Sequence, residues 1–481
     1  MKKKKQPIKA SLLALVAGLV VLVSCETATE PEKDVDLRNP NLPLSNSLIE
    51  VEQIYDGTQL IWDLIDGPAG FYYEGYQEDG CVVGSTDFLG YEQWRQTLPF
   101  NVREILKLPQ SVGAASEGVL VVSCFDSDGD DWSNYGYLTV LSKDGSILDQ
   151  KAYGSVDEAL VLTAVTHTAE PWTFIAVGGT RINGVRCPMI VLFTVSPDGE
   201  ITKLETKVFE EVLHVLFGDV IRRYTDFGQE PPRVSSQWIS RYFISGYRYS
   251  PDPGNITAHR LDLTAAPDSF ALNLSWSADV VAFKGMKTTP CSGQTITTNQ
   301  NVVYVVGSTD IDKGEGNPTG GVYWDAGLVA SFTEDGHQNW IKVVELTGYS
   351  DRYYGCYITS SGLYAVGVSS AFWYSESRRV FGYGLVSRLE AGTGNELAHM
   401  TFGDPNYASG FGTFLQTPSG NYCGGWTKEA VSGGNQNGWL IGFDIDFSGS
   451  EPDWSRLPAT VSTDARPLQG SSLQRLPFGP H

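Results

Sequence analysis

A short unit that recurs along the chain limits what the chain can fold into. The clearest copy spans Val302 to Trp340. An apolar, β-branched run ends at Gly307, a polar loop follows, and a second apolar run leads into Asp335-Gly336. Because glycine accepts the positive φ of a tight hairpin turn, the unit predicts a strand, a loop, a second strand, a tight turn and a third strand.

The same apolar run, stopped by Gly or Ser, recurs along the chain. Further copies begin at Cys81, Val119, Phe174, Tyr242, Leu363 and Tyr422. The hairpin recurs at Asp144-Gly145 and Asp198-Gly199, with a looser copy at 389–394. One such sheet cannot bury both faces alone, so the copies must stack, and closing them into a ring leaves few exposed edges. The repeats therefore predict an all-β fold over 51–457. The expected fold is a β-propeller of about seven blades (six to eight), each a four-stranded antiparallel sheet.

Two stretches leave their element assignment open. The run 59–62 resembles a last strand without a sheet of its own, and we expect it to complete a sheet supplied by the C-terminal end. In 200–240, apolar pairs recur at roughly helical spacing. This segment is either an inserted helix or two strands with long loops.

The N-terminus has the pattern of an export signal. Residues 1–24 combine lysines at positions 2–5 with an apolar stretch over 12–23. The sequence Leu22-Val23-Ser24-Cys25 resembles a bacterial lipobox, which implies cleavage before Cys25 and a lipid on that residue. The alternative is an uncleaved membrane anchor. Residues 25–50 are predicted to be a disordered acidic tether, and 458–481 a disordered tail.

Charge and cysteine content narrow the classes of partner. The chain has a net charge of −22, and removing 1–24 removes five lysines and no acids, which gives −22 − 5 = −27. This charge argues against nucleic acid and against an anionic membrane surface as partners of the folded body. Six cysteines follow Cys25; three of them, Cys81, Cys124 and Cys423, lie in or beside apolar runs and suit burial. Export would permit disulfides, but no spacing identifies pairs.

One acidic loop is a candidate calcium site. Asp126, Asp128 and Asp130 gather oxygen ligands at the spacing that a hard cation prefers. The loop is not an EF-hand, because its sixth position is Asp131 and its twelfth is Tyr137. Calcium is the only cofactor that the sequence suggests, and the alternative is a solvated acidic turn.

Two long loops are the candidate binding surface. They cover 310–326 and 369–382, between the second and third strands of consecutive blades, and should emerge on the same face. The aromatic and basic residues that they bring together are Trp324, Phe372, Trp373, Tyr374, Arg378 and Arg379. Exposed aromatics beside arginine suit a protein or glycan ligand. The alternative is that these aromatics belong to the core.

No pattern selects catalytic residues. The sequence has no G-x-S-x-G elbow and no Walker sequence, and its six histidines are scattered. The leading hypothesis is therefore a binding scaffold without catalysis. The alternative is a carbohydrate-active enzyme, a glycosidase or lyase, which would place a pair of inward carboxylates at one mouth of the ring.

Some motifs resemble known families. The stretch 389–397 resembles the strand-turn-strand of quinoprotein-type propeller repeats. The Asp-Gly hairpins with a following Trp, as in 334–340, resemble repeats of exported propeller lipoproteins in Bacteroidetes. Adjacent cysteines, which quinoprotein dehydrogenases have beside their cofactor, are missing here. The resemblance implies a non-catalytic protein scaffold of the cell envelope, held to the outer membrane through lipid, on its periplasmic face or at the cell surface.

Overall fold

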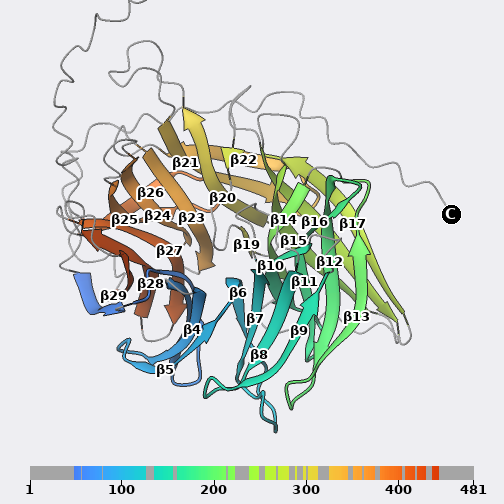
Figure 1. Cartoon of the computed structure of the whole chain (residues 1–481). Coiled ribbons are helices and arrows are strands. Elements are labelled where there is room, and N and C mark those ends of the chain that lie inside the picture. Colours follow the sequence, from blue (N-terminus) through green and yellow to red (C-terminus); the bar gives the residue numbers. More distant parts are fainter. Residues whose placement is uncertain are drawn as a thin grey trace, which may run out of the picture. The chain divides into compact units, whose positions relative to one another are not determined.

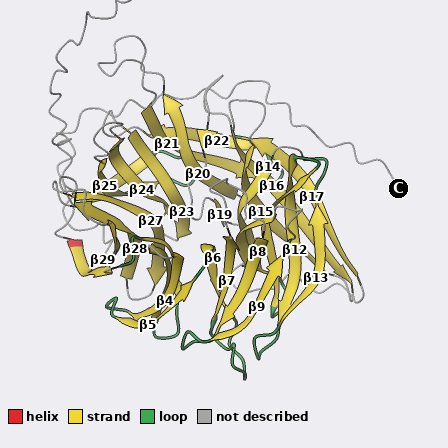
Figure 2. Ribbon diagram, viewed as in Figure 1, coloured by secondary structure: helices red, strands yellow, loops and turns green. Residues whose placement is uncertain are grey.

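The computed structural model describes most of the predicted repeat region. The described residues are 48–55, 57–77, 80–125, 135–154, 160–212, 215–222, 238–248, 255–266, 269–280, 288–289, 296–299, 302–311, 324–344, 350–359, 362–373, 380–403, 407–417, 420–429 and 436–443. All of them belong to one compact unit, Leu42–His481. Apart from a helical turn at Leu48, their regular structure is entirely strand (Figure 2). Nowhere in these residues is there a helix of the length and hydropathy needed to cross a membrane.

The strands form six hydrogen-bonded sheets. Sheet 1 contains β2 (Leu60–Asp66), β3 (Gly70–Gln77), β4 (Gly80–Asp87) and β5 (Glu92–Leu98). Sheet 2 contains β6 (Asn101–Lys107), β7 (Val119–Phe125), β8 (Tyr135–Leu141) and β9 (Ile147–Tyr153). Sheet 3 contains β10 (Leu160–His167), β11 (Thr173–Ile182), β12 (Val185–Val195) and β13 (Ile201–Val208). Sheet 4 contains β14 (Val215–Arg222), β15 (Trp238–Arg248), β16 (Asn255–Ala266) and β17 (Ser269–Asp279).

The remaining two sheets are larger. Sheet 5 contains β18 (Thr288–Thr289), β19 (Ile296–Asn299), β20 (Val302–Ile311), β21 (Trp324–Thr333) and β22 (Gln338–Val344). Sheet 6 has eight strands: β23 (Ser350–Thr359), β24 (Gly362–Trp373), β25 (Val380–Leu389), β26 (Glu396–Phe402), β27 (Tyr407–Thr417), β28 (Gly420–Glu429), β29 (Gln436–Phe443) and β1 (Ile49–Tyr55). The all-β class and the four-stranded antiparallel sheets are confirmed. The count of about seven blades is not reproduced as seven separate sheets, because the last eight strands are joined into one sheet.

The sheets are arranged as in a propeller. Each sheet contacts the next along the chain, and sheet 6 contacts sheet 1 through β27 and β2. In Figure 1 the first strands, such as β6, β10 and β23, lie nearest the middle, whereas outer strands such as β5, β13 and β17 lie at the periphery. Within sheet 6, β25 and β27 are joined by a single parallel pair, Gly382 with Ala408.

The two ends of the repeat region meet in sheet 6. Strand β1 runs antiparallel to β29 and pairs Tyr55 with Gly438. Closure by an N-terminal strand was expected, but the predicted segment was wrong. Residues 59–62 overlap β2, which pairs with β3 in sheet 1, and the closing strand is Ile49–Tyr55 instead. The two runs lie close together and both suit a strand, so only their pairing partners distinguish them. Strand β1 also begins inside the predicted tether.

The recurring apolar runs occupy the same place in successive sheets, with one exception. The runs from Val119, Phe174, Tyr242, Val302 and Leu363 lie in the second strand of their sheets, counted in hydrogen-bonding order. The run from Tyr422 lies in β28 of sheet 6, between β27 and β29. The run from Cys81 instead belongs to the third strand, β4, and the second strand of its sheet is β3. This shift explains why the interval between the first two copies is short.

The glycines that end several of these runs have a steric cause. A Cβ on Gly178 would lie 1.9 Å from the carbonyl oxygen of Val161, and one on Gly367 would lie 1.8 Å from that of Arg352. Both carbonyls belong to the first strand of the same sheet. Because a Cβ cannot approach a backbone atom so closely, these second strands need glycine at this point.

The Asp-Gly hairpins are confirmed as the turns between third and fourth strands. Gly145, Gly199 and Gly336 have φ values of 86°, 97° and 83°. In sheet 5, the amide of Gly336 donates to the carbonyl of Thr333 over 3.0 Å. Glycine accepts this positive φ without the steric cost that a side chain would add.

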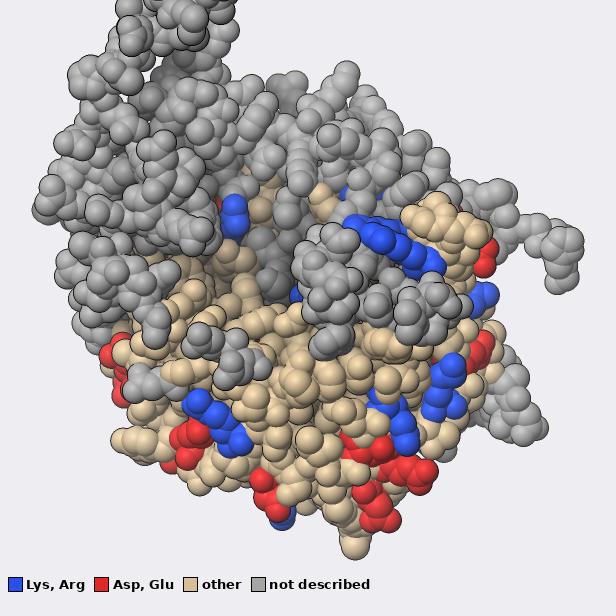
Figure 3. All heavy atoms as spheres, viewed as in Figure 1, with Lys and Arg blue, Asp and Glu red and all other residues tan. Residues whose placement is uncertain are grey.

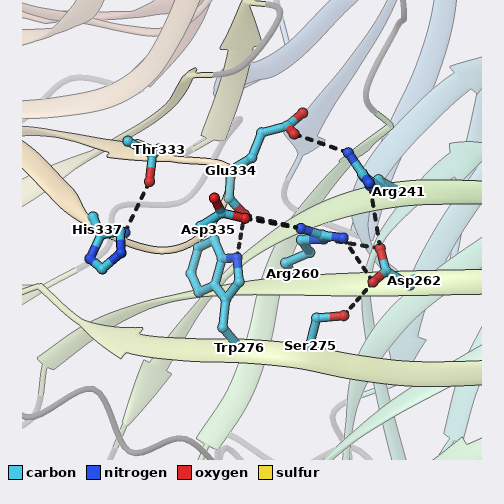
Figure 4. Close-up of polar contacts among 9 residues, drawn as sticks. All are labelled: Arg241, Arg260, Asp262, Ser275, Trp276, Thr333, Glu334, Asp335 and His337. Carbon is cyan, nitrogen blue, oxygen red and sulfur yellow. Dashed lines mark hydrogen bonds and ion pairs between the residues drawn. The ribbon is translucent and has the colours of Figure 1, made fainter.

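Two of these turns also join neighbouring sheets. The indole nitrogen of Trp276 in sheet 4 donates to the carbonyl of Glu334, just before Gly336, over 2.5 Å (Figure 4). Trp94 in sheet 1 does the same to the carbonyl of Lys143, just before Gly145, over 2.8 Å. A Cβ on either glycine would lie within 3 Å of the tryptophan ring. The glycine of the turn therefore lets the ring of the preceding sheet pack directly on the turn.

Charged groups contribute to the same contact between sheets 4 and 5. Arg260 of β16 lies 3.5 Å from the carbonyl oxygen of Glu334 and 3.7 Å from the carboxylate of Asp335. Arg241 donates to Glu334 over 3.0 Å (Figure 4).

On the face shown in Figure 3, the Asp and Glu side chains of the lower half lie at the outer rim.

The two remaining sequence questions are partly answered. The described parts of 200–240 form strands β13 and β14, so these parts follow the two-strand alternative. Cys81, Cys124 and Cys423 are buried, as expected for small apolar residues. Cys187 and Cys356 are buried as well, and none of these five cysteines forms a disulfide.

Candidate functional site

The first strands of sheets 1, 2, 3, 4 and 6, together with β27 in sheet 6, each contain a β-bulge. The extra residues are Trp62 in β2, Arg103 in β6, Thr163 in β10, Gly218 in β14, Tyr354 in β23 and Gly412 in β27. A bulge bends its strand and re-aims a side chain. The rings of Trp62 and Tyr354 lie 5.6 Å apart although they come from sheets 1 and 6. Some bulge residues of different sheets therefore meet near the axis.

A cavity of about 320 Å³ lies among the first strands of sheets 1 to 4. Four bulge residues and four acidic residues contribute to its lining: Trp62, Arg103, Thr163, Gly218, Asp63, Glu74, Glu104 and Asp219. We call this space the axial cavity. It is the candidate functional site because it gathers ionisable and aromatic groups in one concave place.

Three of the four acidic residues hold neighbouring sheets together. Asp63 accepts a hydrogen bond of 3.3 Å from the amide of Ile105 in sheet 2. Glu104 accepts one of 2.7 Å from the amide of Val165 in sheet 3. Each carboxylate therefore reaches the first strand of the next sheet along the chain.

Asp219 repeats this arrangement further along the chain. Asp219 accepts a hydrogen bond of 3.2 Å from the amide of Ile296 in sheet 5 and one of 2.6 Å from the amide of the adjacent Val220. Asp63 likewise accepts a hydrogen bond of 2.8 Å from the amide of the adjacent Leu64. We call the contacts of Asp63, Glu104 and Asp219 the carboxyl clasps. They supply hydrogen-bond acceptors to main-chain amides of first strands, which lie at the edges of their sheets.

Glu74 is the exception among the four. It lies on β3 and is 1% exposed. Neither of its carboxyl oxygens has a hydrogen-bond partner among the described residues. A buried polar group without a partner is costly, so such a group calls for an explanation.

The electrostatics of the cavity follow from burial. Burial raises the pKa of Asp63 to about 6, although the amides of Ile105 and Leu64 oppose the shift. Burial, and then the negative charge of Asp63, hold the pKa of Glu74 well above its usual value. For Glu104, burial and then the charges of Asp219 and Asp63 raise the pKa in the same way.

Raised carboxyl pKa values are what a general acid needs near neutral pH. However, the three clasp residues already accept hydrogen bonds from the main chain, and this ties them to the architecture. Within the described part of the chain, no group of three His, Cys, Asp or Glu residues is arranged to hold a metal ion. The cavity can therefore offer hydrogen bonds and one arginine cation to a ligand.

The sequence-predicted binding residues lie elsewhere. Trp324 begins β21, where it pairs with Ile311. Phe372 and Trp373 were placed in a loop, but the backbone at both positions continues β24 and pairs with Phe381 and Val380 of β25. The prediction of a loop was wrong at these two positions. The sequence does not show where the hydrogen-bonded pairing of β24 with β25 ends, and this pairing continues through Phe372 and Trp373.

The other predicted positions cannot be placed. Tyr374, Arg378 and Arg379 lie outside the described residues, as do Asp126, Asp128 and Asp130 of the candidate calcium loop. The connections from β20 to β21 and from β24 to β25 do join second to third strands, as predicted.

Sequence reasoning missed the axial cavity. Its residues come from separate repeats, and no local motif joins them. One signal was present: an acidic residue follows the bulge position in Trp62-Asp63, Arg103-Glu104 and Gly218-Asp219. Aligning the first strands of the repeats would have brought these three acids into one column.

Comparisons with known proteins identify no family for this chain. No protein-family model matches the chain, and no curated protein matches it. Among solved structures, the WD40 domain of SCAP from fission yeast is 9% identical, with a TM-score of 0.33, over 82% of this chain and 91% of that chain. BBS1N in complex with ARL6DN is 9% identical, with a TM-score of 0.38, over 82% and 96%.

An enzyme appears beside these two domains. An exo-1,5-alpha-L-arabinanase from a bovine ruminal metagenomic library is 12% identical, with a TM-score of 0.26, over 60% of this chain and 94% of that chain. All three likenesses are too distant to carry an argument about function. The sheet topology and the contacts between successive sheets define the class as β-propeller.

Proposed function

We propose that this chain is a lipid-anchored β-propeller of the cell envelope that binds a protein or glycan and performs no catalysis. The carboxyl clasps carry this proposal. Three of the four acidic residues in the axial cavity accept main-chain hydrogen bonds, so the cavity offers no free pair of carboxylates of the kind that glycoside cleavage uses. The proposed anchor is a lipid on Cys25, with the outer membrane as the location.

We infer that sheet 6 comprises two blades, which would give a ring of seven. The support is that β25 and β27 share a single pair, Gly382 with Ala408, whereas the strands on either side pair along their length. In this arrangement β1 supplies the outer strand of the last blade.

We place the ligand on the face that carries the connections from β20 to β21 and from β24 to β25. These connections occupy equivalent places in sheets 5 and 6. The proposed contact residues are Trp324, Phe372, Trp373, Tyr374, Arg378 and Arg379. A calcium ion at Asp126, Asp128 and Asp130 stays a separate prediction.

Replacing Trp373 by alanine is expected to weaken binding of the natural ligand by about 1–3 kcal/mol, the range of an aromatic anchor. Stability should change little, because we propose that this side chain serves binding and not the core. The ligand would be captured from envelope extracts and on glycan arrays, and its affinity measured by calorimetry. A matched control is Trp276→Ala, which removes a tryptophan from the contact between sheets 4 and 5 and should lower stability instead.

Two results would contradict the hypothesis of a non-catalytic binding scaffold. If Trp373→Ala unfolds the protein at much lower denaturant, the residue is core and the patch does not exist. If the purified protein releases sugar products from polysaccharides, and Glu104→Gln abolishes the release, the carbohydrate-active alternative is correct. That alternative is favoured by the raised pKa values of Glu74 and Glu104.

Lipid attachment predicts a specific processing defect. Replacing Cys25 by alanine should leave an unprocessed precursor without lipid, because the lipobox-like sequence places the acceptor thiol at that position. Metabolic labelling with a fatty acid, followed by mass spectrometry of the mature protein, measures the modification. Ser24→Ala keeps a small residue before Cys25 and serves as the control. A wild-type mature protein that carries no lipid would overturn the anchor.

A further inference from the structure

The axial cavity contains a cation whose terminal groups are uncommitted. Arg103 is the extra residue at the bulge of β6. It lines the cavity and is exposed. Its Nε donates to the thiol sulfur of Cys124 over 3.2 Å. Its two terminal nitrogens donate to no described residue. A guanidinium with free terminal N–H groups is shaped to receive a carboxylate through two parallel hydrogen bonds.

Glu74 contributes a second unmet polar group to the same place. It lines the cavity, and both of its oxygens lack a hydrogen-bond partner among the described residues. It also interacts electrostatically with Arg103. Because its burial favours the protonated form, its carboxyl group can both donate to and accept from a ligand hydroxyl.

The rest of the wall is amphipathic. Trp62 and Tyr76 line the cavity, together with Gln59 and Gln436. Among the described residues, the hydroxyl of Tyr76 has no hydrogen-bond partner. Aromatic rings beside a few convergent polar groups are typical of small-molecule sites, and the cavity of about 320 Å³ is large enough for one pyranose ring.

We propose that the axial cavity binds a single acidic sugar residue, a hexuronate. Its carboxylate pairs with Arg103, its hydroxyl groups bond with Glu74 and Tyr76, and one face of its ring lies against Trp62. This site is separate from the loop face proposed above and does not depend on it.

Other ligand classes fit the wall less well. A neutral sugar would leave the guanidinium of Arg103 without an anion. An organic amine would place a second positive charge beside Arg103. A small inorganic anion would satisfy Arg103 but would not reach the aromatic rings and Glu74. Asp63 and Glu104 each accept a hydrogen bond from a main-chain amide. These hydrogen bonds reduce the repulsion that the two carboxyl groups would exert on a bound anion.

The test is a titration of the full-length mature protein with galacturonate and glucuronate, each compared with the neutral sugar, galactose or glucose. We expect saturable binding of at least one hexuronate, at least about tenfold tighter than its neutral partner, which corresponds to about 1.4 kcal/mol. Calorimetry measures the affinity. The comparison on the wild-type protein needs no variant, so a folding defect cannot obscure it.

Variants then assign the residues. Arg103→Gln should weaken hexuronate binding at least about tenfold and leave the weak binding of the neutral sugar unchanged. Arg103→Lys keeps the charge but loses the two parallel hydrogen bonds. Its affinity for the hexuronate should lie between those of the wild-type protein and Arg103→Gln. Arg95→Gln is the matched control, since Arg95 lies on the outer strand β5 and pairs with Glu92. Circular dichroism confirms that each variant is folded.

Three results would overturn the proposal. The first is equal affinity for hexuronates and neutral sugars, and the second is unchanged hexuronate binding in folded Arg103→Gln. The third is no saturable hexuronate binding up to about 20 mM, a concentration well above useful affinities for a single sugar. None of these results bears on a partner bound at the loop face, because Trp373→Ala tests that face independently.

Discussion

Replacing Gly367 by alanine is expected to destabilise the protein by at least about 3 kcal/mol, or to prevent folding. The new Cβ would lie 1.8 Å from the carbonyl oxygen of Arg352, and the clash is with backbone that cannot rotate away. Strands β23 and β24 would have to separate at the bulge, and hydrogen bonds of that pair would be lost. The cost exceeds that of ordinary overpacking, because two strands must move rather than one side chain.

The matched control for this substitution is Gly392→Ala. A Cβ on Gly392 meets no atom within 4 Å, so the same chemical change should alter stability little. Urea unfolding followed by fluorescence measures both variants. Equal stability of the two variants would mean that the recurring glycine has no steric role. A strong loss in Gly367→Ala alone would support the same explanation for Gly178, whose Cβ would lie 1.9 Å from a carbonyl oxygen.

Removing a carboxyl clasp should have the second large effect. In Asp63→Ala, the buried amides of Leu64 and Ile105 lose their acceptor. Two unsatisfied amides should cost about 2–5 kcal/mol of unfolding free energy. Asp66→Ala is the control on the same strand, since among the described residues its exposed carboxylate forms only a long ion pair of 3.5 Å with Lys107. Similar losses in the two variants would refute the clasp.

The clasp also predicts how stability depends on pH. Burial raises the pKa of Asp63 to about 6 in the folded protein, against about 3.9 in an unfolded chain. Between these values the folded state holds a proton that the unfolded state has lost, so unfolding free energy falls as pH rises from about 4 to about 6. Above that range this contribution is constant.

The size of this pH effect is roughly 2–3 kcal/mol for Asp63 alone. It should disappear in Asp63→Ala, so the stability difference between wild type and variant should be larger at pH 4 than at pH 7. Denaturant unfolding across this range measures it. Glu74 and Glu104 contribute slopes of the same sign. The part of each slope that comes from burial is common to both proteins, whereas the part that comes from the charge of Asp63 is lost in the variant together with Asp63. A constant difference across the range would show that Asp63 does not titrate as described.

The sequence by itself determined the class of fold. Its Asp-Gly turns, such as Asp335-Gly336, are correct because the positive φ of a tight turn is a local requirement. The second strands were recognised from their apolar runs for the same local reason. The exception was the run from Cys81, where the third strand of sheet 1 has the stronger pattern and β3 carries its glycine, Gly75, inside an aromatic run.

Only the tertiary structure decided the closing strand and the axial cavity. Residues 49–55 and 59–62 are both suited to a strand, and the choice depends on pairing with β29, far away in sequence. The cavity likewise depends on bulges that bring residues of separate repeats to one axis. Glu74 is an ordinary charged residue in the sequence. Its loss of water, and its lack of a hydrogen-bond partner among the described residues, arise only when the sheets assemble. Burial of that kind is a property of the assembled ring and has no local pattern.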